Sequence, residues 1–261
     1  MPQPSTDMTW DPRRYAAYTD ERGRPFVELV QRVGAQRPRL VVDLGCGPGT
    51  LTASLTQRWP DADVVGVDSS PEMLAAAQGV RGPRFELGDL RSWQAPDLID
   101  VLVSNAALQW VPGHLDLLPR WVDRLAPGGW LALQVPGNHD EPSHTIRREL
   151  AAEEPYAEHT AGVAAPKSFD AVTYADALGS LGCSVDAWET TYLHVLQGPD
   201  PVFTWVCGTG ARPTLQALPD RLRPGFEAEF KHRLAEAYPP RPKGVVLPFR
   251  RVFAVARTPH T

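Results

Sequence analysis

Three glycines follow a short apolar run early in the chain. The segment VVDLGCGPG places Gly45, Gly47 and Gly49 at alternate positions, with Asp43 two residues before the first of them. Glycines let a loop turn tightly and let ligand atoms approach the backbone. The spacing GxGxG differs from the GxGxxG of a nicotinamide dinucleotide site, and a carboxylate at Asp43 would repel a pyrophosphate. The loop therefore favours a ligand that carries a cation, such as the amino group of a methionine moiety.

Two further acids stand at the ends of predicted strands. Asp68 lies 19 residues after Gly49, which is the distance that one intervening helix requires. A carboxylate there can accept hydrogen bonds from both hydroxyls of a ribose, and Ser69 is assigned to the same contact. Asp89 ends the next strand, where it could accept a hydrogen bond from an adenine amino group while Leu90 offers its backbone N–H. The alternative for either acid is a helix cap or a turn residue.

The composition narrows the class of protein. The chain has 261 residues, 43% of them hydrophobic, and a formal net charge of −5. A net negative chain argues against a general nucleic-acid binder, because phosphate binding needs a basic face. The cysteines and histidines have no disulfide or metal-site spacing, so we expect no metal. Because no apolar run reaches about 18 residues and no signal core opens the chain, we expect a cytoplasmic protein with no membrane partner and no obligate protein partner.

Strands and helices alternate at short spacing in the first half of the chain. The strands are unbroken apolar runs, which are typical of a parallel sheet buried on both faces with right-handed crossovers. Ligands of such sheets bind beyond the carboxyl ends of the strands, where the glycine loop and both acids lie. Thr50 is predicted to cap the first helix and Ser70, followed by Pro71, the second. The predicted strands are 40–44, 64–67, 84–89, 98–103 and 130–135.

After Val135 the pattern changes. We expect helices over 145–152 and 170–182, a strand that alternates in polarity over 184–196, a proline-broken helical region, and a last strand over 249–256. The predicted organisation is an N-terminal tail and lead-in helix (1–32), a cofactor-binding core (33–135), a mobile cap or lid segment (136–169), a helix and the sixth strand of the core (170–196), a helical cap (197–244) and the last strand (245–261).

The set DLGCGPG…DSS…GDL…SNAALQWV…APGG resembles the class I S-adenosylmethionine-dependent methyltransferases. The resemblance is closer still to the trans-aconitate methyltransferases of that family, and it extends to Trp10-Asp11-Pro12, Glu141-Pro142, Trp205-Val206 and the last strand. It implies an α/β fold, Rossmann-like and doubly wound, with seven mostly parallel strands, an antiparallel last strand and a helical cap. It also implies S-adenosyl-L-methionine as cofactor, S-adenosyl-L-homocysteine as product, and a small tricarboxylate, trans-aconitate or a close relative, as substrate.

The chemistry implied by the resemblance is transfer of a methyl group to a carboxylate, which gives a monomethyl ester. A carboxylate is ionised at neutral pH, so no catalytic acid or base is assigned and catalysis is expected to be mostly positioning. Asn105, Gln109 and Trp110 follow the fourth strand and are expected to line the transfer cleft, with Asn105 also on the cofactor. A polyanion needs convergent donors, and the substrate-binding candidates are Tyr15, Arg22, Arg24, Tyr192, His194, Trp205 and Arg212.

Two other assignments and the alternatives complete the expectations. Arg250 and Arg251 point to opposite faces of a strand, and neither is expected in the pocket. Cys46 is expected to be a small filler and not a nucleophile. The alternative functions are a methyltransferase for a carbon or nitrogen acceptor, a non-catalytic module that binds S-adenosylmethionine, and, disfavoured by the loop spacing, a nicotinamide dehydrogenase.

Overall fold

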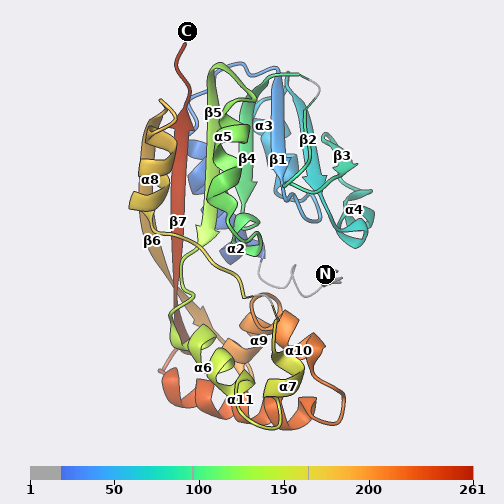
Figure 1. Cartoon of the computed structure of the whole chain (residues 1–261), viewed down its shortest axis with the longest axis vertical. Helices are drawn as coiled ribbons and strands as arrows, with labels where there is room; N and C mark the ends of the chain where they lie inside the picture. The colour runs from blue at the N-terminus through green and yellow to red at the C-terminus, as the bar shows by residue number, and fades with distance from the viewer. Residues whose placement is uncertain (1–18, 96, 164, 261) are drawn as a thin grey trace.

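The computed structural model describes residues 19–95, 97–163 and 165–260 and has a seven-stranded sheet at its centre (Figure 1). The strands are ordered β3-β2-β1-β4-β5-β7-β6. Strands β1 to β5 are parallel, whereas β7 is antiparallel to both of its neighbours. The bounds are β1 Leu40–Leu44, β2 Asp63–Asp68, β3 Arg84–Leu87, β4 Ile99–Asn105, β5 Leu125–Pro136, β6 Ser184–Leu196 and β7 Val245–Arg257. The predicted fold class and the antiparallel last strand are confirmed.

Helices cover both faces of the sheet, as unbroken apolar strands require. One face packs on α2 (Thr19–Gln31) and α3 (Thr52–Arg58), whose buried side chains include Phe26, Leu29 and Leu55. The other packs on α5 (Leu118–Val122) and α8 (Ala171–Gly179), which contribute Trp121 and Tyr174. The remaining core helix, α4 (Pro71–Ala77), contacts β2 and β3 at one edge of the sheet. No helix in the described ranges is long and apolar enough to cross a membrane.

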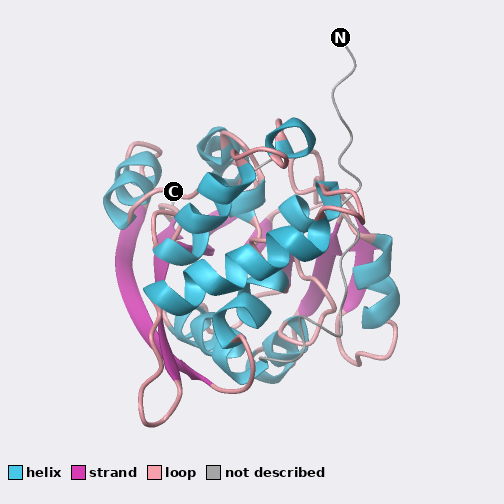
Figure 2. Ribbon diagram, turned by 90° about the horizontal axis from the view of Figure 1, so that it is seen from below, coloured by secondary structure: helices cyan, strands magenta, loops and turns pink. Residues whose placement is uncertain are grey.

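A helical cap lies beyond the carboxyl ends of the parallel strands (Figures 1 and 2). It consists of α6 (Pro142–Ala151), α7 (Ala157–Thr160), α9 (Pro201–Cys207), α10 (Arg212–Ala217) and α11 (Arg223–Ala237). The cap has its own apolar core around Trp205, Phe226 and Phe230. Leu196 of β6 and Phe249 of β7 belong to that core as well, so these two long strands run from the sheet into the cap and join its core to the sheet.

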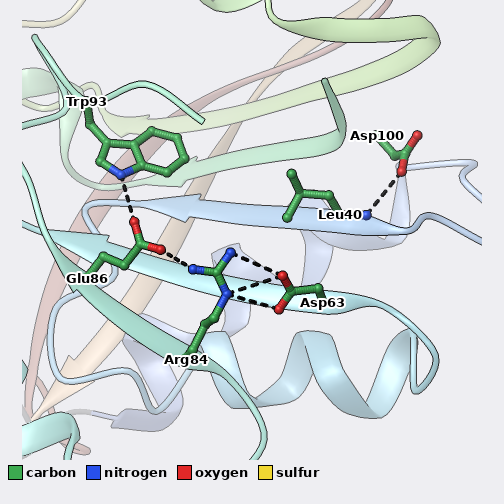
Figure 3. A network of polar contacts seen from close by, with 6 residues as sticks. All are labelled: Leu40, Asp63, Arg84, Glu86, Trp93 and Asp100. Carbon is green, nitrogen blue, oxygen red and sulfur yellow. Dashed lines mark hydrogen bonds and ion pairs between the residues drawn. The ribbon is translucent and has the colours of Figure 1, made fainter. Parts of the chain in front are cut away.

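Polar contacts tie down the far end of the sheet (Figure 3). The carboxylate of Asp100, on β4, accepts the backbone N–H of Leu40 at 3.0 Å and fixes the start of β1 against β4. At the edge, the Arg84 guanidinium lies between the carboxylates of Asp63 and Glu86, and the indole N–H of Trp93 donates to Glu86 at 3.0 Å. These contacts hold the exposed edge strand β3 on β2, away from the ends of the strands where ligands bind.

The predicted helix caps and strand bounds are confirmed only in part. Ser70 caps α4 and accepts the Met73 N–H, with Pro71 at the first helical position, as expected. The predicted cap at Thr50 is wrong, because α3 begins at Thr52 with Leu51 in the cap position and no side chain caps it. The last strand starts at Val245 and not at 249, and β5 starts at Leu125 and not at 130, because both strands continue through residues that break the apolar run. A short 3-10 helix, η2 (His114–Leu117), precedes α5.

Candidate active site

The glycine loop after β1 combines close packing with one open position. Gly45, Gly47 and Gly49 have φ angles of 82°, 57° and 75°, a region that favours glycine. A Cβ at Gly45 would lie 2.3 Å from the Ala107 side chain, and one at Gly49 would lie 2.4 Å from Phe85. A Cβ at Gly47 would meet nothing within 4 Å. The backbone at Gly47 is therefore open to a ligand, while its neighbours are held by the protein.

Asp43 lies beneath this loop and is almost fully buried. Its carboxylate accepts a hydrogen bond of 2.7 Å from the Thr52 hydroxyl at the start of α3. Burial raises the pKa of Asp43 to about 7, more than the Thr52 hydrogen bond lowers it, and the nearby charge of Asp68 raises it further. A cation bound at the loop would relieve the cost of this buried negative charge.

Asp68, at the end of β2, holds the glycine loop by a hydrogen bond. One carboxylate oxygen accepts the Gly47 N–H at 2.8 Å and the other accepts the Ser70 N–H at 2.9 Å. Burial raises the pKa of Asp68, against the effect of these hydrogen bonds. Asp89, beyond β3, accepts the Arg91 N–H at 2.8 Å and pairs with its guanidinium. Asp68 thus ends β2 beside the loop, as predicted, whereas β3 ends at Leu87, so Asp89 lies two residues beyond the strand and in an ion pair.

The turn after β4 lies directly beside the glycine loop. Ala106 has a φ of 54°, a strained angle for a residue with a side chain, and its N–H donates to the Gln134 carbonyl at 2.8 Å. The side-chain amide of Gln109 donates to the Ala106 carbonyl at 2.6 Å. This sharp turn directs Asn105, Gln109 and Trp110 to one hollow, which is the grouping predicted from the sequence.

This cap hollow has a volume of about 650 Å³, including space open to solvent, and lies between the sheet and the cap. The turn after β4 supplies one wall, and the segment from the end of β5 into α6 supplies another. The cap adds Trp205, Thr209 and Gly210, the first half of β7 adds Phe249 and Arg251, and Pro166 completes the lining. The lining residues that carry hydrogen-bonding groups central to its chemistry are Asn105, Gln109, Trp110, His139, His144 and Arg251.

The described lining of the hollow carries positive charge. Its described lining includes one arginine, Arg251, and no acidic side chain. Arg251 is 6% exposed, and its guanidinium lies 4.6 Å above the centre of the Phe249 ring. Burial lowers the pKa of His139 to about 4 and that of His144 to about 3, so both rings are neutral near pH 7. An anion in the hollow would therefore meet a buried cation and neutral donors.

A second buried arginine stands behind this wall. Arg147, on α6, is 4% exposed and donates to the Thr214 hydroxyl at 2.6 Å. Among the described residues no carboxylate pairs with Arg147, and burial lowers its pKa to about 10. The charge of Arg147 also lowers the pKa of both imidazoles. Because a buried charge without a counter-ion is costly, this side of the hollow is suited to an anion.

The predicted substrate-binding side chains are dispersed. Tyr15 and the side chain of Arg22 lie outside the described residues. Arg24 pairs with Glu28 at 2.7 Å, and the Tyr192 hydroxyl donates to the same carboxylate at 2.6 Å, so these residues form a cluster on α2 and β6. The remaining three belong to the cap region. His194 stacks on Trp205, which lines the hollow. Arg212 begins α10, and its charge contributes to lowering the pKa of Glu72.

Arg251 requires a correction. The prediction that Arg250 and Arg251 face opposite ways is confirmed, but the expectation that neither enters the pocket is wrong. Arg251 pairs in register with Pro136 at the end of β5, and both line the hollow. Arg250 instead pairs with Glu189 at 3.0 Å on the other face. Strand alternation alone could have selected one of the two arginines, and the register with β5 identifies which.

Cys46 is buried and burial raises its thiol pKa, so it is a filler of the loop, as expected. Sequence reasoning missed His139, His144 and Arg147. For His144 and Arg147 the available signal was their spacing on α6, where residues three apart share a helix face; His139 precedes that helix and had no such signal.

Comparison with known proteins agrees with this geometry. Residues 41–129 match the model of a methyltransferase domain family. The trans-aconitate 2-methyltransferase of Streptomyces avermitilis is 49% identical, over 97% of this chain and 98% of that relative. The enzyme of the same name from Mycobacterium tuberculosis is 51% identical, over 95% of this chain and 96% of that relative.

Solved structures show the fold in more distant proteins. The YcgJ protein of Bacillus subtilis has a TM-score of 0.59 at 12% identity and covers 91% of this chain and 99% of its own. Phosphoethanolamine N-methyltransferase 2 of Haemonchus contortus, in complex with S-adenosyl-L-methionine, has a TM-score of 0.54 at 17% identity and covers 90% of this chain and 52% of its own.

The strand order, the antiparallel β7 and the glycine loop define a class I methyltransferase. The antiparallel β7 also distinguishes this sheet from the parallel sheet of a nicotinamide dehydrogenase. Given full-length relatives at about half identity, the chain belongs to the family of trans-aconitate 2-methyltransferases. It is therefore an enzyme of the methyltransferase kind, which sets aside the non-catalytic alternative.

Proposed function

We propose that the protein transfers a methyl group from S-adenosyl-L-methionine to a carboxylate of trans-aconitate and forms a monomethyl ester. The observation that carries this proposal is the buried Arg251 in a hollow whose described lining holds no acid, directly beside the turn after β4. The names of the full-length relatives support the same substrate. The hollow is large enough for a small acid and carries the charge that a polyanion needs.

The residues at the glycine loop fit S-adenosylmethionine. Gly47 leaves the space that ligand atoms would fill, and Asp43 provides a buried carboxyl group below the loop that a bound cation would hold in its ionised form. Asp68 presents its carboxylate at the end of β2, where its two backbone donors hold it in place for ribose hydroxyls. When bound, the cofactor would supply an electrophilic methyl group on a sulfonium. Asp89, Leu90 and Ser69 remain assigned to the cofactor.

Catalysis by this chain would be positioning of an ionised nucleophile. Arg251 would hold one carboxylate of the substrate by charge and hydrogen bonds, and the Gln109 and Trp110 side chains would limit its movement. The carboxylate oxygen has no proton to lose near neutral pH. No general base is therefore needed, which agrees with two imidazoles in the hollow that have pKa values of about 4 and about 3.

A matched pair of arginine variants tests the proposal. Arg251→Met should raise the KM for trans-aconitate on the order of 100-fold, because removal of one partner from a desolvated charge pair costs about 2–5 kcal/mol. Its affinity for the cofactor should stay within about threefold. Arg250→Met, one residue away on the opposite face, should leave the KM near the wild-type value. Equal effects of the two variants, or no ester in an assay with labelled methyl donor and mass detection, would refute the proposed function.

A carbon or nitrogen acceptor is the second candidate. The observation in its favour is the pair of neutral imidazoles, each of which could accept a proton, beside the aromatic walls Trp110 and Trp205. Bases with pKa values of about 3 and about 4 are weak at neutral pH, which favours the carboxylate. A rate that falls as pH drops through a pKa near 7, at saturating cofactor, would favour this candidate instead.

A further inference from the structure

His144 occupies a fixed position on the wall of the cap hollow. It lies in the first turn of α6 and is 6% exposed. Its Nδ1 is 3.0 Å from the Ser143 hydroxyl and 3.5 Å from the side-chain nitrogen of Asn138. The His139 ring packs edge-on against it, with 5.5 Å between the ring centres. The imidazole is thus held on one edge by polar partners and on one face by a second ring.

These partners determine where the ring carries its proton. The amide nitrogen of Asn138 can only donate, and the Ser143 hydroxyl can donate as well. With the Asn138 nitrogen as donor, Nδ1 accepts, and we assign the proton of the neutral ring to Nε2. Burial keeps the ring neutral by lowering its pKa to about 3, with smaller contributions from His139, Arg147 and Arg148. His144 is consequently a neutral donor with one N–H left for a ligand.

The free edge of the ring faces the hollow at Gly210. A Cβ at Gly210 would lie 2.9 Å from His144 Nε2, and both residues line the hollow. A glycine at this position leaves the space in front of Nε2 open. The φ of Gly210 is not positive, so the backbone does not itself require glycine here. The absence of a side chain serves access to Nε2.

The charge behind His144 selects the kind of group that Nε2 would bind. Arg147 is one helical turn further along α6, buried and without a carboxylate partner among the described residues. The Nε–H of Arg147 is buried and has no hydrogen-bond acceptor there. A carboxylate at His144 would gain from this nearby cation, whereas a second cation would be repelled.

We propose that His144 is a specificity-determining residue that donates a hydrogen bond from Nε2 to a carboxylate of the substrate other than the one held by Arg251. This assignment rests on the proposed function. His144 then recognises one particular carboxylate of a tricarboxylic acid, and the cation at Arg147 strengthens that contact without touching the substrate.

The test uses acids that each lack one carboxylate of trans-aconitate. Mesaconate lacks the carboxylate on the methylene carbon, glutaconate lacks the one on the central carbon, and itaconate lacks the one on the vinyl carbon. Dissociation constants are measured by calorimetry with S-adenosylhomocysteine present, so that no turnover occurs. His144→Phe keeps a ring of similar size but removes the donor, and His144→Gln can place an amide N–H near the position of Nε2.

We expect His144→Phe to weaken trans-aconitate and two of the three dicarboxylates by about 10- to 100-fold, or about 1.4–2.8 kcal/mol. The third acid, which lacks the carboxylate bound by His144, should bind the variant as it binds the wild type. His144→Gln should restore most of the affinity. Gly210→Ala, which fills the space before Nε2, should reproduce the pattern of His144→Phe without altering the ring itself. His232→Phe, on the exposed side of α11, is the matched control.

The outcomes separate the two proposals. Equal weakening of all four acids by His144→Phe would mean a structural role and would overturn the inference, as would no weakening at all. Unchanged binding of one and the same dicarboxylate, with weaker binding of the other three acids, under both His144→Phe and Gly210→Ala would support it. If the wild-type enzyme forms no ester of trans-aconitate in the labelled-methyl assay, the proposed function fails first and the inference fails with it.

Discussion

Replacement of the buried acid below the glycine loop should change how stability depends on pH. The pKa of Asp43 is raised from 3.8 to about 7, chiefly by burial. Between these two values the folded protein keeps a proton that the unfolded chain has lost. Stability therefore falls as pH rises through this window. Asp43→Asn removes the titrating group but keeps an oxygen that can accept from Thr52.

The magnitude follows from the two pKa values. At about pH 5 the ionisation of Asp43 opposes folding by about 1.7 kcal/mol, and at about pH 8 by about 4.3 kcal/mol. The free energy of unfolding of the wild type, relative to Asp43→Asn, should thus decrease by about 2.6 kcal/mol between these conditions. The cost of burying the extra amide donor is independent of pH and cancels in the comparison.

Urea denaturation of both proteins without cofactor, at the two pH values, measures this difference. Asp61→Asn removes an exposed carboxylate and controls for the change in net charge. A difference between wild type and Asp43→Asn that is the same at both pH values would show that Asp43 is not held protonated by burial. A difference of the opposite sign would show that hydrogen bonds to the carboxylate outweigh its desolvation.

Three further predictions concern the loop and the hollow. Gly49→Ala should cost about 2–4 kcal/mol of stability, because its Cβ would meet Phe85 at 2.4 Å in a left-handed conformation. Gly47→Ala should cost only about 1 kcal/mol of stability but weaken cofactor binding. Denaturation measures the stability of both variants, and calorimetry measures their affinity for the cofactor. Asp68→Ala should weaken S-adenosylmethionine binding while circular dichroism shows an intact fold; unchanged affinity would remove the ribose assignment. At saturating cofactor, kcat should persist well below pH 7, since the nucleophile stays ionised; a decline through a pKa near 7 would reveal a base.

The sheet was predictable because each of its first strands is an apolar run bounded by turn residues. Ser70 and Pro71 mark the start of α4 by local chemistry alone, and the structure confirms them. The prediction at Thr50 failed because α3 begins only at Thr52, whose hydroxyl donates to the buried Asp43. Local sequence gives the type of an element more reliably than the residue at which it begins.

The cap hollow was predictable only in part, because its walls come from distant segments. Asn105, Gln109 and Trp110 follow a strand directly, so their common position was visible in the sequence. Arg251 and His144 meet them only through the register of β7 on β5 and the packing of α6. Long-range pairing of this kind leaves no periodic signal in a single chain, so the sequence does not distinguish Arg251 from the arginines of the N-terminal segment and the cap.

The long ribbon of β6 and β7 has a mechanical consequence. Its thirteen paired positions run without interruption along one edge of the sheet and into the cap. The cap is therefore attached to the sheet along β6 and β7, and a rotation of the whole cap would have to bend these two paired strands. On the segment between α7 and α8, two hydrogen bonds add a second attachment: the Lys167 N–H donates to the Gln109 carbonyl and the Ser168 hydroxyl donates to the Pro136 carbonyl.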